Sequence, residues 1–190
     1  MTRLWLVRHA PTHVKAMVGW SDVPADTSDT GAFGRLAAHL PDAPVVTSGM
    51  LRTRQTAEAL DLRGDRLPDE PGLREIHFGH WELKGFDEVS ETSPDHIRAF
   101  WDQPGDIAPP DGESWNAFAA RVDEATDRLV ARGLSDLIVI CHFGVILRHV
   151  ERALSIPTVE AFSHRIDNLS VTEIEVAPRG WIAHRINHVP

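Results

Sequence analysis

Four basic side chains are placed where they could bind a phosphate group and react with it. Each follows a run of strand-forming residues: Arg8 and His9 after residues 4–7, Arg52 after residues 44–48, and His142 after residues 136–141. Guanidinium groups bind phosphate oxygens in a bidentate manner, and a neutral imidazole is a nucleophile. If the three runs are neighbouring parallel strands, their carboxyl ends meet at one edge of the sheet. The spacing therefore predicts an anion pocket at that edge.

The expected pocket also determines the charges of its histidines. Neighbouring arginines disfavour the imidazolium form, so one histidine stays neutral and nucleophilic at pH 7. A bound phosphate would keep the other histidine protonated, so that it donates a hydrogen bond. We expect further donors from the backbone N–H groups at the starts of the helices that follow Arg52 and His142.

Phosphoryl transfer also requires a proton donor for the leaving oxygen, near these cations. Glu75 is the best candidate, because it lies in LREIHFGHWE (residues 73–82), where Gly79 and the aromatic residues indicate a packed loop. Glu82 is the second candidate. For each of them the alternative is an ordinary surface carboxylate, and both interpretations remain open at this point.

The elements that would position these residues alternate between strands and helices. Strands are expected at residues 3–8, 44–48 and 136–141. Helices are expected at about residues 30–40, from Arg52 onward, at 85–102 with a break before Pro94, from Ser114 to about Ala131, and from His142 to about Leu154. The alternating segments SVTEIEV and WIAHRI predict a final hairpin. This order predicts an α/β fold: a three-layer sandwich with a mostly parallel central sheet, helices on both faces and a C-terminal antiparallel hairpin.

Composition limits the class of protein. A chain of 190 residues suits one domain, residues 1–190, and no apolar run is long enough to span a membrane. Its net charge of −9 argues against a nucleic-acid surface, which needs clustered cations. The early Arg8 interrupts the apolar start too soon for a signal peptide, so we expect a cytoplasmic protein. No membrane partner is expected, and the sequence favours neither a monomer nor a homodimer.

No metal site is expected. Cys141 is the only cysteine, so a thiolate-rich site is excluded, and its apolar surroundings indicate a buried thiol. The chain has 11 histidines, but those outside the expected pocket do not follow zinc-ligand spacing: His13, His77, His80 and His149. Surface or supporting roles are expected for them.

Six motifs, in order along nearly the whole chain, resemble those of the histidine phosphatase superfamily, which includes phosphoglycerate mutases and α-ribazole phosphatases. They are LVRHAPT (residues 6–12), VGWSDVP (18–24), TSGMLRTRQTA (47–57), LREIHFGHWE (73–82), DGESWNAFAARV (111–122) and VICHFGVI (139–146). The resemblance is to the short phosphatases of the family. It implies a histidine phosphatase domain with a small cap insertion around residues 82–113.

The resemblance also implies a role for each site residue. His9 would attack phosphorus and become a phosphohistidine, while Arg8, Arg52 and His142 would hold the phosphate oxygens. Glu75 would protonate the leaving alcohol and later serve as base for water. No cofactor and no metal are implied, because arginines supply the positive charge. Two further residues of the first motif region are candidates for phosphate binding, Thr12 and Lys15.

Four residues depart from the family pattern. Ala10 stands in place of the usual glycine, Lys15 in place of a frequent asparagine, and Leu83 in place of a common glycine. Phe143 replaces a glycine after the second histidine. Its ring would narrow the pocket or stack on a ring of the substrate, so we expect an altered specificity.

The leading hypothesis is a metal-independent phosphatase that acts on a small phosphorylated metabolite. A phosphoglycerate mutase is the alternative among enzymes, although the family's mutases are longer where this chain has only residues 82–113. A non-catalytic domain that binds a phosphorylated ligand is the alternative outside enzymes. The presence of all five core residues favours catalysis: Arg8, His9, Arg52, Glu75 and His142.

Overall fold

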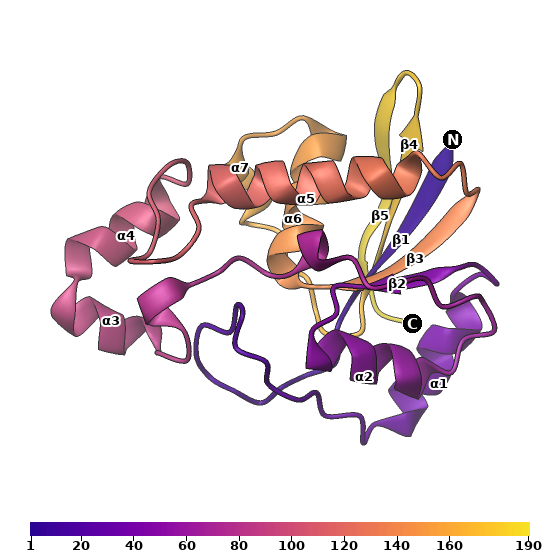
Figure 1. Ribbon diagram of the computed structural model, residues 1–190, viewed down its shortest axis with the longest axis horizontal. Coiled ribbons are helices and arrows are strands. Elements are labelled where there is room, and N and C mark those ends of the chain that lie inside the picture. The colour runs from indigo at the N-terminus through magenta and orange to yellow at the C-terminus, as the bar shows by residue number, and fades with distance from the viewer.

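The computed structural model describes residues 1–190 and has helices on both faces of one five-stranded sheet (Figure 1). The elements are β1 (Thr2–Arg8), α1 (Thr30–His39), β2 (Val45–Thr47), α2 (Leu51–Leu60), η1 (Pro71–Leu73), η2 (Gly79–Trp81), α3 (Phe86–Thr92), α4 (Pro94–Asp102), α5 (Trp115–Val130), β3 (Asp136–Cys141), α6 (Phe143–Leu154), α7 (Thr158–Ala161), β4 (Val171–Ala177) and β5 (Gly180–His188). The sheet order is β2-β3-β1-β4-β5. Strands β1, β2 and β3 are parallel, whereas β4 is antiparallel to β1 and β5 to β4.

Alternate residues of β3 belong to the cores on opposite faces of the sheet. Leu137 and Val139 pack in the larger core with apolar residues of α5 and α6. Ile138 and Ile140 pack in the smaller core with residues of α1 and α2. Because successive side chains of a strand point to opposite faces, a continuous apolar run suits a strand covered on both sides. This explains why β3 lies inside the sheet.

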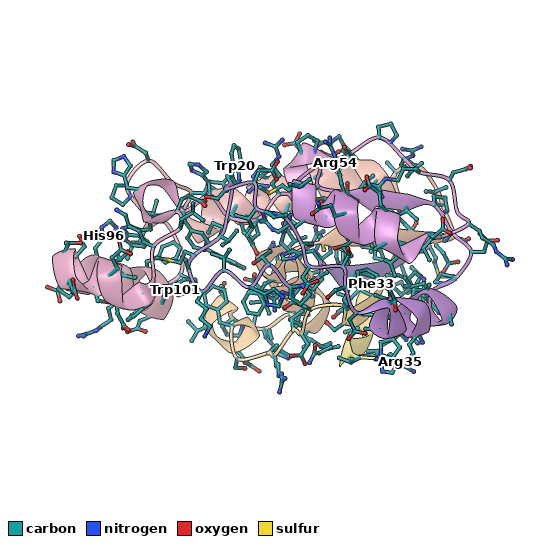
Figure 2. All side chains as sticks on the ribbon, turned by 90° about the horizontal axis from the view of Figure 1, so that it is seen from below. Trp20, Phe33, Arg35, Arg54, His96 and Trp101 are labelled. Carbon is teal, nitrogen blue, oxygen red and sulfur yellow. The ribbon has the colours of Figure 1, made fainter.

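Helices α3 and α4 extend to one side of the body (Figure 1). They are separated at Ser93, because Pro94 disfavours a helical conformation in the residue before it and starts the next helix. His96 and Trp101 of α4 lie at this end of the molecule, far from Phe33 of α1 (Figure 2).

The predicted fold class is confirmed, and the expected strands, helices and final hairpin are all present with ends shifted by one or two residues. Helix α7 and the two 3₁₀ turns, η1 and η2, were not predicted. They span only three or four residues, too few for a periodic pattern to appear. None of the helices combines the length and the apolar character that crossing a bilayer requires.

Candidate active site

The parallel pairing of β1 with β3 brings His9 and His142 together. Arg8 lies opposite Cys141 in this ladder, and each is the last residue of its strand. His9 therefore follows β1 at the same level as His142 follows β3. The two imidazole rings are edge to face, with their centroids 5.2 Å apart. The expectation that the carboxyl ends of these strands place the two histidines side by side is confirmed.

Hydrogen bonds fix the tautomer of His9. Nδ1 lies 2.7 Å from the carbonyl oxygen of Ala10, which can only accept, so Nδ1 carries the proton. Nε2 keeps its lone pair and accepts from Nε of Arg52 at 3.3 Å. Burial and the charge of Arg52 lower the pKa of His9 to about 3. His9 is therefore a neutral imidazole that keeps its lone pair on Nε2, the form in which an imidazole can act as a nucleophile.

The backbone around His9 is held from two distant parts of the chain. The side-chain amide of Asn168 donates to the carbonyl of His9 at 2.7 Å, and the N–H of Ala10 donates to the hydroxyl of Thr56 at 2.9 Å. Ala10 itself is fully buried in the smaller core, so its methyl group fits where the family usually has a glycine.

Arg52 is fully buried on the first turn of α2, and its guanidinium is bound at several positions. Nη2 donates to the carbonyl of Gly19 at 2.8 Å, and Nη1 donates to that of Ser21 at 3.1 Å. Burial lowers the pKa of Arg52, while the charge of Glu75 raises it. The loop at residues 19–21 therefore orients this arginine toward His9.

Glu82 holds that loop in place. Its carboxylate accepts from the backbone N–H groups of Gly19, Trp20 and Ser21 at 2.7–3.1 Å, and from that of Phe78 at 3.0 Å. The Ser21 hydroxyl donates to it as well. Burial alone would raise the pKa of Glu82, but these hydrogen bonds keep that pKa below its usual value. Glu82 stays ionised, which suits a positioning role better than that of a proton donor.

Glu75 is the buried carboxyl group of the site, with 8 % of its surface exposed. One oxygen accepts from the N–H of Ile76 at 3.0 Å and the other from the N–H of Gly144 at 3.2 Å. Burial raises the pKa of Glu75, and the two backbone hydrogen bonds and the charges of Arg52 and Arg8 only partly oppose this. A carboxyl group with a raised pKa is suited to donate a proton near neutral pH.

Arg121 of α5 fixes the backbone that leads up to and carries this carboxyl group. Its guanidinium donates to the carbonyls of Gly72, Arg74 and Glu75, and pairs with Glu113 at 2.7 Å. The indole N–H of Trp20 donates to the carbonyl of Glu75 at 2.9 Å. Glu75 is thus held by α5 and by the loop that also holds Arg52.

A chain of hydroxyl groups determines the tautomer of His142. Thr53 donates to the carbonyl of Met50, so it accepts from Ser48 at 3.1 Å. The Ser48 hydroxyl then accepts from Nε2 of His142 at 2.7 Å. This leaves Nδ1 of His142 as the atom without a proton. Burial and the charge of Arg52 lower the pKa of His142 well below its usual value.

Two buried nitrogen atoms of this cluster have no hydrogen-bond partner within the protein: Nδ1 of His142 and Nε of Arg8. Nη1 of Arg8 donates to the carbonyl of Ile166 at 2.6 Å, and its guanidinium carbon lies 5.4 Å from the ring centre of Phe143. Buried polar atoms are normally paired, and unpaired ones are typical of ligand sites. Nε of Arg8 is a free donor for an oxygen of an anion, and Nδ1 of His142 becomes one only when it takes up a proton.

Two of the backbone donors expected at helix starts are already used within the protein. The N–H of Leu51, at the start of α2, donates to Asp22 at 2.7 Å. The N–H of Gly144, near the start of α6, donates to Glu75. The expectation that helix starts supply phosphate donors is therefore wrong for these two groups, because carboxylates occupy them.

Thr12 and Lys15 are placed differently from the five core residues. Thr12 is half-buried and Lys15 is exposed. Neither side chain makes a hydrogen bond with the core residues. The histidines outside the site also have other partners, as His13 pairs with Asp26. The chain contains no group of three or more histidine, cysteine, aspartate or glutamate side chains that could hold a metal ion.

Several supporting residues were not identified from the sequence. The sequence patterns place Ser48 only at the end of an expected strand, and they indicate no role for Asn168 or Arg121. Ser48 follows the strand β2 directly, which is a signal that could have indicated it. No local pattern marks Asn168, which reaches His9 across 159 positions of sequence.

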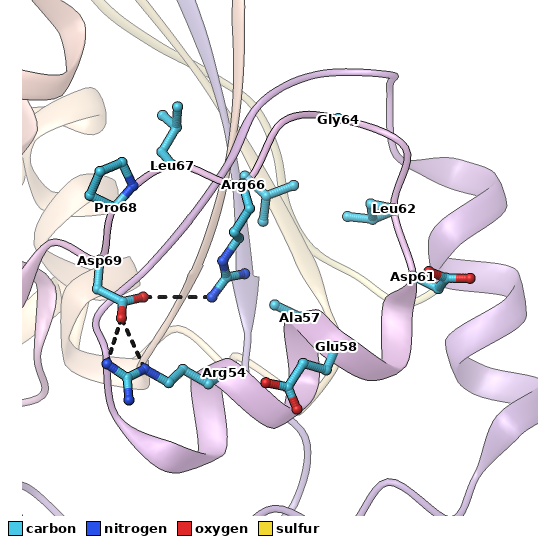
Figure 3. A pocket seen from close by; sticks show the side chains of 11 residues that line it. Arg54, Ala57, Glu58, Asp61, Leu62, Gly64, Arg66, Leu67, Pro68 and Asp69 are labelled. Carbon is cyan, nitrogen blue, oxygen red and sulfur yellow. Dashed lines mark hydrogen bonds and ion pairs between the residues drawn. The ribbon is translucent and has the colours of Figure 1, made fainter.

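A cavity lies beside β2, between α2 and residues 61–69 (Figure 3). Asp69 in its wall pairs with Arg54 at 2.6 Å and with Arg66 at 3.6 Å. Asp69 also accepts from the hydroxyl of Thr47, the residue before Ser48. This network supports the turn that carries Ser48.

The fold is that of a recognised class of proteins. Residues 4–189 match the model of the histidine phosphatase superfamily, branch 1. The chain belongs to this superfamily. The four basic residues of the cluster all lie within the matched range: Arg8, His9, Arg52 and His142.

Two relatives and one solved structure illustrate what this chain is similar to. The adenosylcobalamin/α-ribazole phosphatase of Salmonella typhimurium is 28% identical over 183 residues, which cover 92% of this chain and 90% of that protein. The probable phosphoglycerate mutase GpmB of Serratia proteamaculans is 28% identical over 194 residues and covers 96% of this chain and 89% of its own length. The structure of Bacillus stearothermophilus YhfR aligns with a TM-score of 0.89 at 28% identity, covering 100% and 98% of the two chains.

Proposed function

We propose that this protein is a metal-independent phosphatase that hydrolyses a small phosphorylated metabolite through a phosphohistidine on His9. In the first step Nε2 of His9 attacks phosphorus, and the bond from phosphorus to the ester oxygen breaks. Glu75 gives its proton to that oxygen, so the alcohol leaves uncharged. In the second step Glu75 takes a proton from water, the water oxygen attacks phosphorus, and the bond to His9 breaks.

The observation that carries this proposal is the state of His9. Its Nδ1–H is bound to a carbonyl, and its Nε2 lone pair faces the buried guanidinium of Arg52. The nucleophilic atom and the charge that would neutralise phosphate are therefore adjacent. Arg8 and His142 contribute the two unpartnered nitrogen atoms. We propose that phosphate oxygens bind to them, and that the phosphate charge favours a proton on Nδ1 of His142.

Thr12 and Lys15 are proposed only as additional contacts that a bound substrate would have to recruit. Lys15 is exposed, so its ammonium group would have to turn toward the phosphate. We further propose that residues 1–190 act as one domain, with α3 and α4 as a cap. The proposed partner is a small molecule, and no nucleic acid or membrane is part of the proposal.

A mutase is the second candidate, and a specific relative favours it. The probable mutase of Serratia proteamaculans aligns over 89% of its own length, so chain length does not separate it from this protein. A mutase would return the phosphoryl group of His9 to a bound acceptor. A phosphatase would transfer that group to water.

The test is phosphate release from p-nitrophenyl phosphate and a panel of metabolites, with EDTA present. Wild type should turn over, whereas His9→Ala should lose at least about a thousandfold in kcat, because the covalent route is removed. Mass spectrometry should detect a phosphoryl group on the peptide that contains His9. Turnover that depends on an added divalent metal, or that survives His9→Ala, would contradict the mechanism.

Two further measurements separate the alternatives. Interconversion of phosphoglycerates in the presence of a bisphosphoglycerate would identify a mutase. Binding of inorganic phosphate without turnover of any ester would identify a non-catalytic binding domain. His13→Ala serves as the matched control, because His13 is exposed and pairs with Asp26 outside the site. It should keep wild-type activity.

A further inference from the structure

The turn between β2 and α2 fixes which nitrogen of His142 carries a proton. Nε2 of His142 lies 2.7 Å from the hydroxyl of Ser48, which lies 3.1 Å from the hydroxyl of Thr53. Thr53 uses its own proton on the carbonyl of Met50, so the proton of Ser48 goes to Thr53 and Ser48 accepts from His142. All three side chains are completely buried, so water does not compete for these contacts. A neutral His142 therefore has its proton on Nε2.

The other ring nitrogen of His142 is left as an acceptor without a partner. Nδ1 is buried, and it makes no hydrogen bond within the protein. The nucleophile proposed above, His9, lies beside it, with the two ring centroids 5.2 Å apart. An unprotonated Nδ1 accepts a hydrogen bond and cannot donate one. A bare phosphate oxygen would meet it lone pair against lone pair, whereas a phosphate hydroxyl would donate to it.

The surroundings of His142 disfavour a second proton while no anion is bound. The groups that face it from the neighbouring elements are three arginines, one histidine and one carboxyl group: Arg8 and His9 at the end of β1, Arg52 of α2, Arg121 of α5, and Glu75, which accepts from the N–H of Gly144. Burial and the charge of Arg52 lower the pKa of His142 well below its usual value. The carboxyl group offers little compensation, because burial raises its own pKa.

We propose that the site binds phosphate as the monoanion, and that the hydroxyl of this monoanion donates to Nδ1 of His142. This inference rests on the proposed phosphatase function and states which ionic form of the substrate the same site selects. During phosphoryl transfer the O–H bond breaks as the N–H bond at Nδ1 forms. The substrate thus brings the proton that then stays on His142 and binds the phosphoryl oxygen. Ser48 is a positioning residue that acts through His142.

The first test counts the protons that accompany binding of inorganic phosphate. Dissolved phosphate is mostly the dianion at about pH 8, so a site that selects the monoanion takes up about one proton per phosphate bound. Isothermal titration calorimetry in buffers of different ionisation enthalpy measures this number. Wild type is compared with Glu75→Gln, which cannot take up a proton at position 75, and we expect about one proton in the variant. Uptake near zero in wild type would overturn the inference, and uptake that Glu75→Gln abolishes would assign the proton to Glu75 instead.

The second test replaces phosphate by sulfate. Sulfate has the shape of phosphate but carries no proton at neutral pH. Charge alone favours sulfate, because its two negative charges would face the guanidinium groups of Arg8 and Arg52. We nevertheless expect its dissociation constant to exceed that of phosphate by at least about 100-fold near pH 6, since an analogue without the hydroxyl leaves a buried polar atom unpaired. Similar dissociation constants for the two anions would overturn the inference.

Variants of the hydroxyl chain test the role of Ser48. Ser48→Ala removes the acceptor for Nε2, and Thr53→Val frees the Ser48 hydroxyl to donate to Nε2. In both proteins a neutral His142 can carry its proton on Nδ1 and donate it to an oxygen. We expect proton uptake to fall well below one per phosphate, and the preference over sulfate to fall about tenfold. Unchanged values in both variants would overturn the inference.

Thr126→Val is the matched control. Thr126 is also buried, and its hydroxyl lies 3.0 Å from Nε2 of another buried histidine, His149, between α5 and α6. Its replacement removes the same kind of contact outside the phosphate cluster. Proton uptake and the preference over sulfate should equal those of wild type, and a loss as large as that of Thr53→Val would show that the effect is not specific to His142.

The outcomes separate this inference from the proposed function. Turnover of esters without proton uptake on phosphate binding would retain the phosphatase and reject the selection of the monoanion. Proton uptake and rejection of sulfate without turnover of any ester would reject the phosphatase and retain the ionic preference of the site. Absence of phosphate binding would reject both.

Discussion

The Cα of Gly144 approaches the Glu75 carboxyl group so closely that a Cβ at position 144 would overlap Oε1 of Glu75. The N–H of the same glycine donates to the other carboxyl oxygen. Gly144 therefore both makes room for the proposed proton donor and orients it.

Gly144→Ala should displace Glu75 and impair protonation of the leaving group. We expect kcat for alkyl phosphates to fall about 10²-fold, with a smaller loss for p-nitrophenyl phosphate, whose leaving oxygen needs no proton. Gly34→Ala is the control, since a Cβ there meets no atom within 4 Å. It should keep activity and gain about 0.5–1 kcal/mol of stability in α1. Equal activity of Gly144→Ala and wild type on alkyl phosphates would remove Glu75 from the acid role.

Glu82→Gln should loosen the loop at residues 19–21 and misplace Arg52. We expect kcat/KM to fall about tenfold for alkyl and p-nitrophenyl esters alike, because phosphate binding is weakened and protonation is not. The inhibition constant of inorganic phosphate should rise by a similar factor. Glu91→Gln, an exposed carboxylate of α3, is the control. A loss confined to poor leaving groups would return Glu82 to the acid role.

The pH dependence of kcat/KM for an alkyl phosphate should report Glu75. Its pKa is raised by burial, so the protonated form persists toward neutral pH and is lost as the pH rises through that value. Activity should fall on the alkaline side, and Glu75→Gln should lack this limb. The pKa of His9, about 3, predicts no loss from protonation of the nucleophile at pH 5. The substrate phosphate also ionises near pH 6. The pH profile for p-nitrophenyl phosphate, whose leaving oxygen needs no proton, measures that effect separately.

His149 should make the fold less stable in acid. Burial lowers its pKa to about 4, below the value of about 6.5 expected for the unfolded chain. Between these values the unfolded chain binds more protons, so stability is present above pH 6.5 and is lost as the pH falls, by about 1.4 kcal/mol per pH unit. Between pH 6.5 and pH 5 the free energy of unfolding of His149→Gln should therefore fall by about 2 kcal/mol less than that of wild type. Denaturant unfolding at both pH values measures this, and identical losses would contradict it.

Leu83, one of the departures from the family pattern, occupies the left-handed region with φ of 61°. This conformation costs a non-glycine residue about 1–2 kcal/mol, and the side chain is half exposed, so it recovers little by burial. Leu83→Gly should raise the free energy of unfolding by about 0.5 kcal/mol after the added freedom of the unfolded glycine is counted. Leu154→Gly, at a leucine at the end of α6 that is also exposed, should lower the free energy of unfolding. A lower stability of Leu83→Gly would show that the leucine side chain contributes packing.

The sequence allowed the parallel strands and the convergence of the basic residues to be predicted, because apolar runs and the residues after them are local signals. His9 and His142 are an example, since each follows its strand directly. The binding of Arg52 by the carbonyls of Gly19 and Ser21 was not predictable in this way. It depends on a loop whose path is set by Glu82, some 60 positions away, and no periodic pattern encodes such a contact.

The roles of the two glutamates illustrate the same limit. Their positions in one motif identified both as candidates, and the sequence and the family resemblance favoured Glu75 without a physical reason for the difference. The difference lies in their surroundings. Glu75 accepts two backbone hydrogen bonds in a buried position. Glu82 accepts five hydrogen bonds, four from the loop at residues 19–21 and one from Phe78. Burial and hydrogen-bond counts arise only from the assembled fold.

The hydrogen bonds to Arg8 and His9 from residues 166–168 have a consequence for biosynthesis. His9 lies near the N-terminus, but Asn168 and the carbonyl of Ile166 hold it and its neighbouring arginine, and β1 pairs with β3 and β4. The ribosome completes β3 before it makes residues 166–168 and β4, so β1 lacks these later partners until more than four-fifths of the chain has been made. A nascent chain released before β4 would carry all five core residues and still lack the scaffold that orients them.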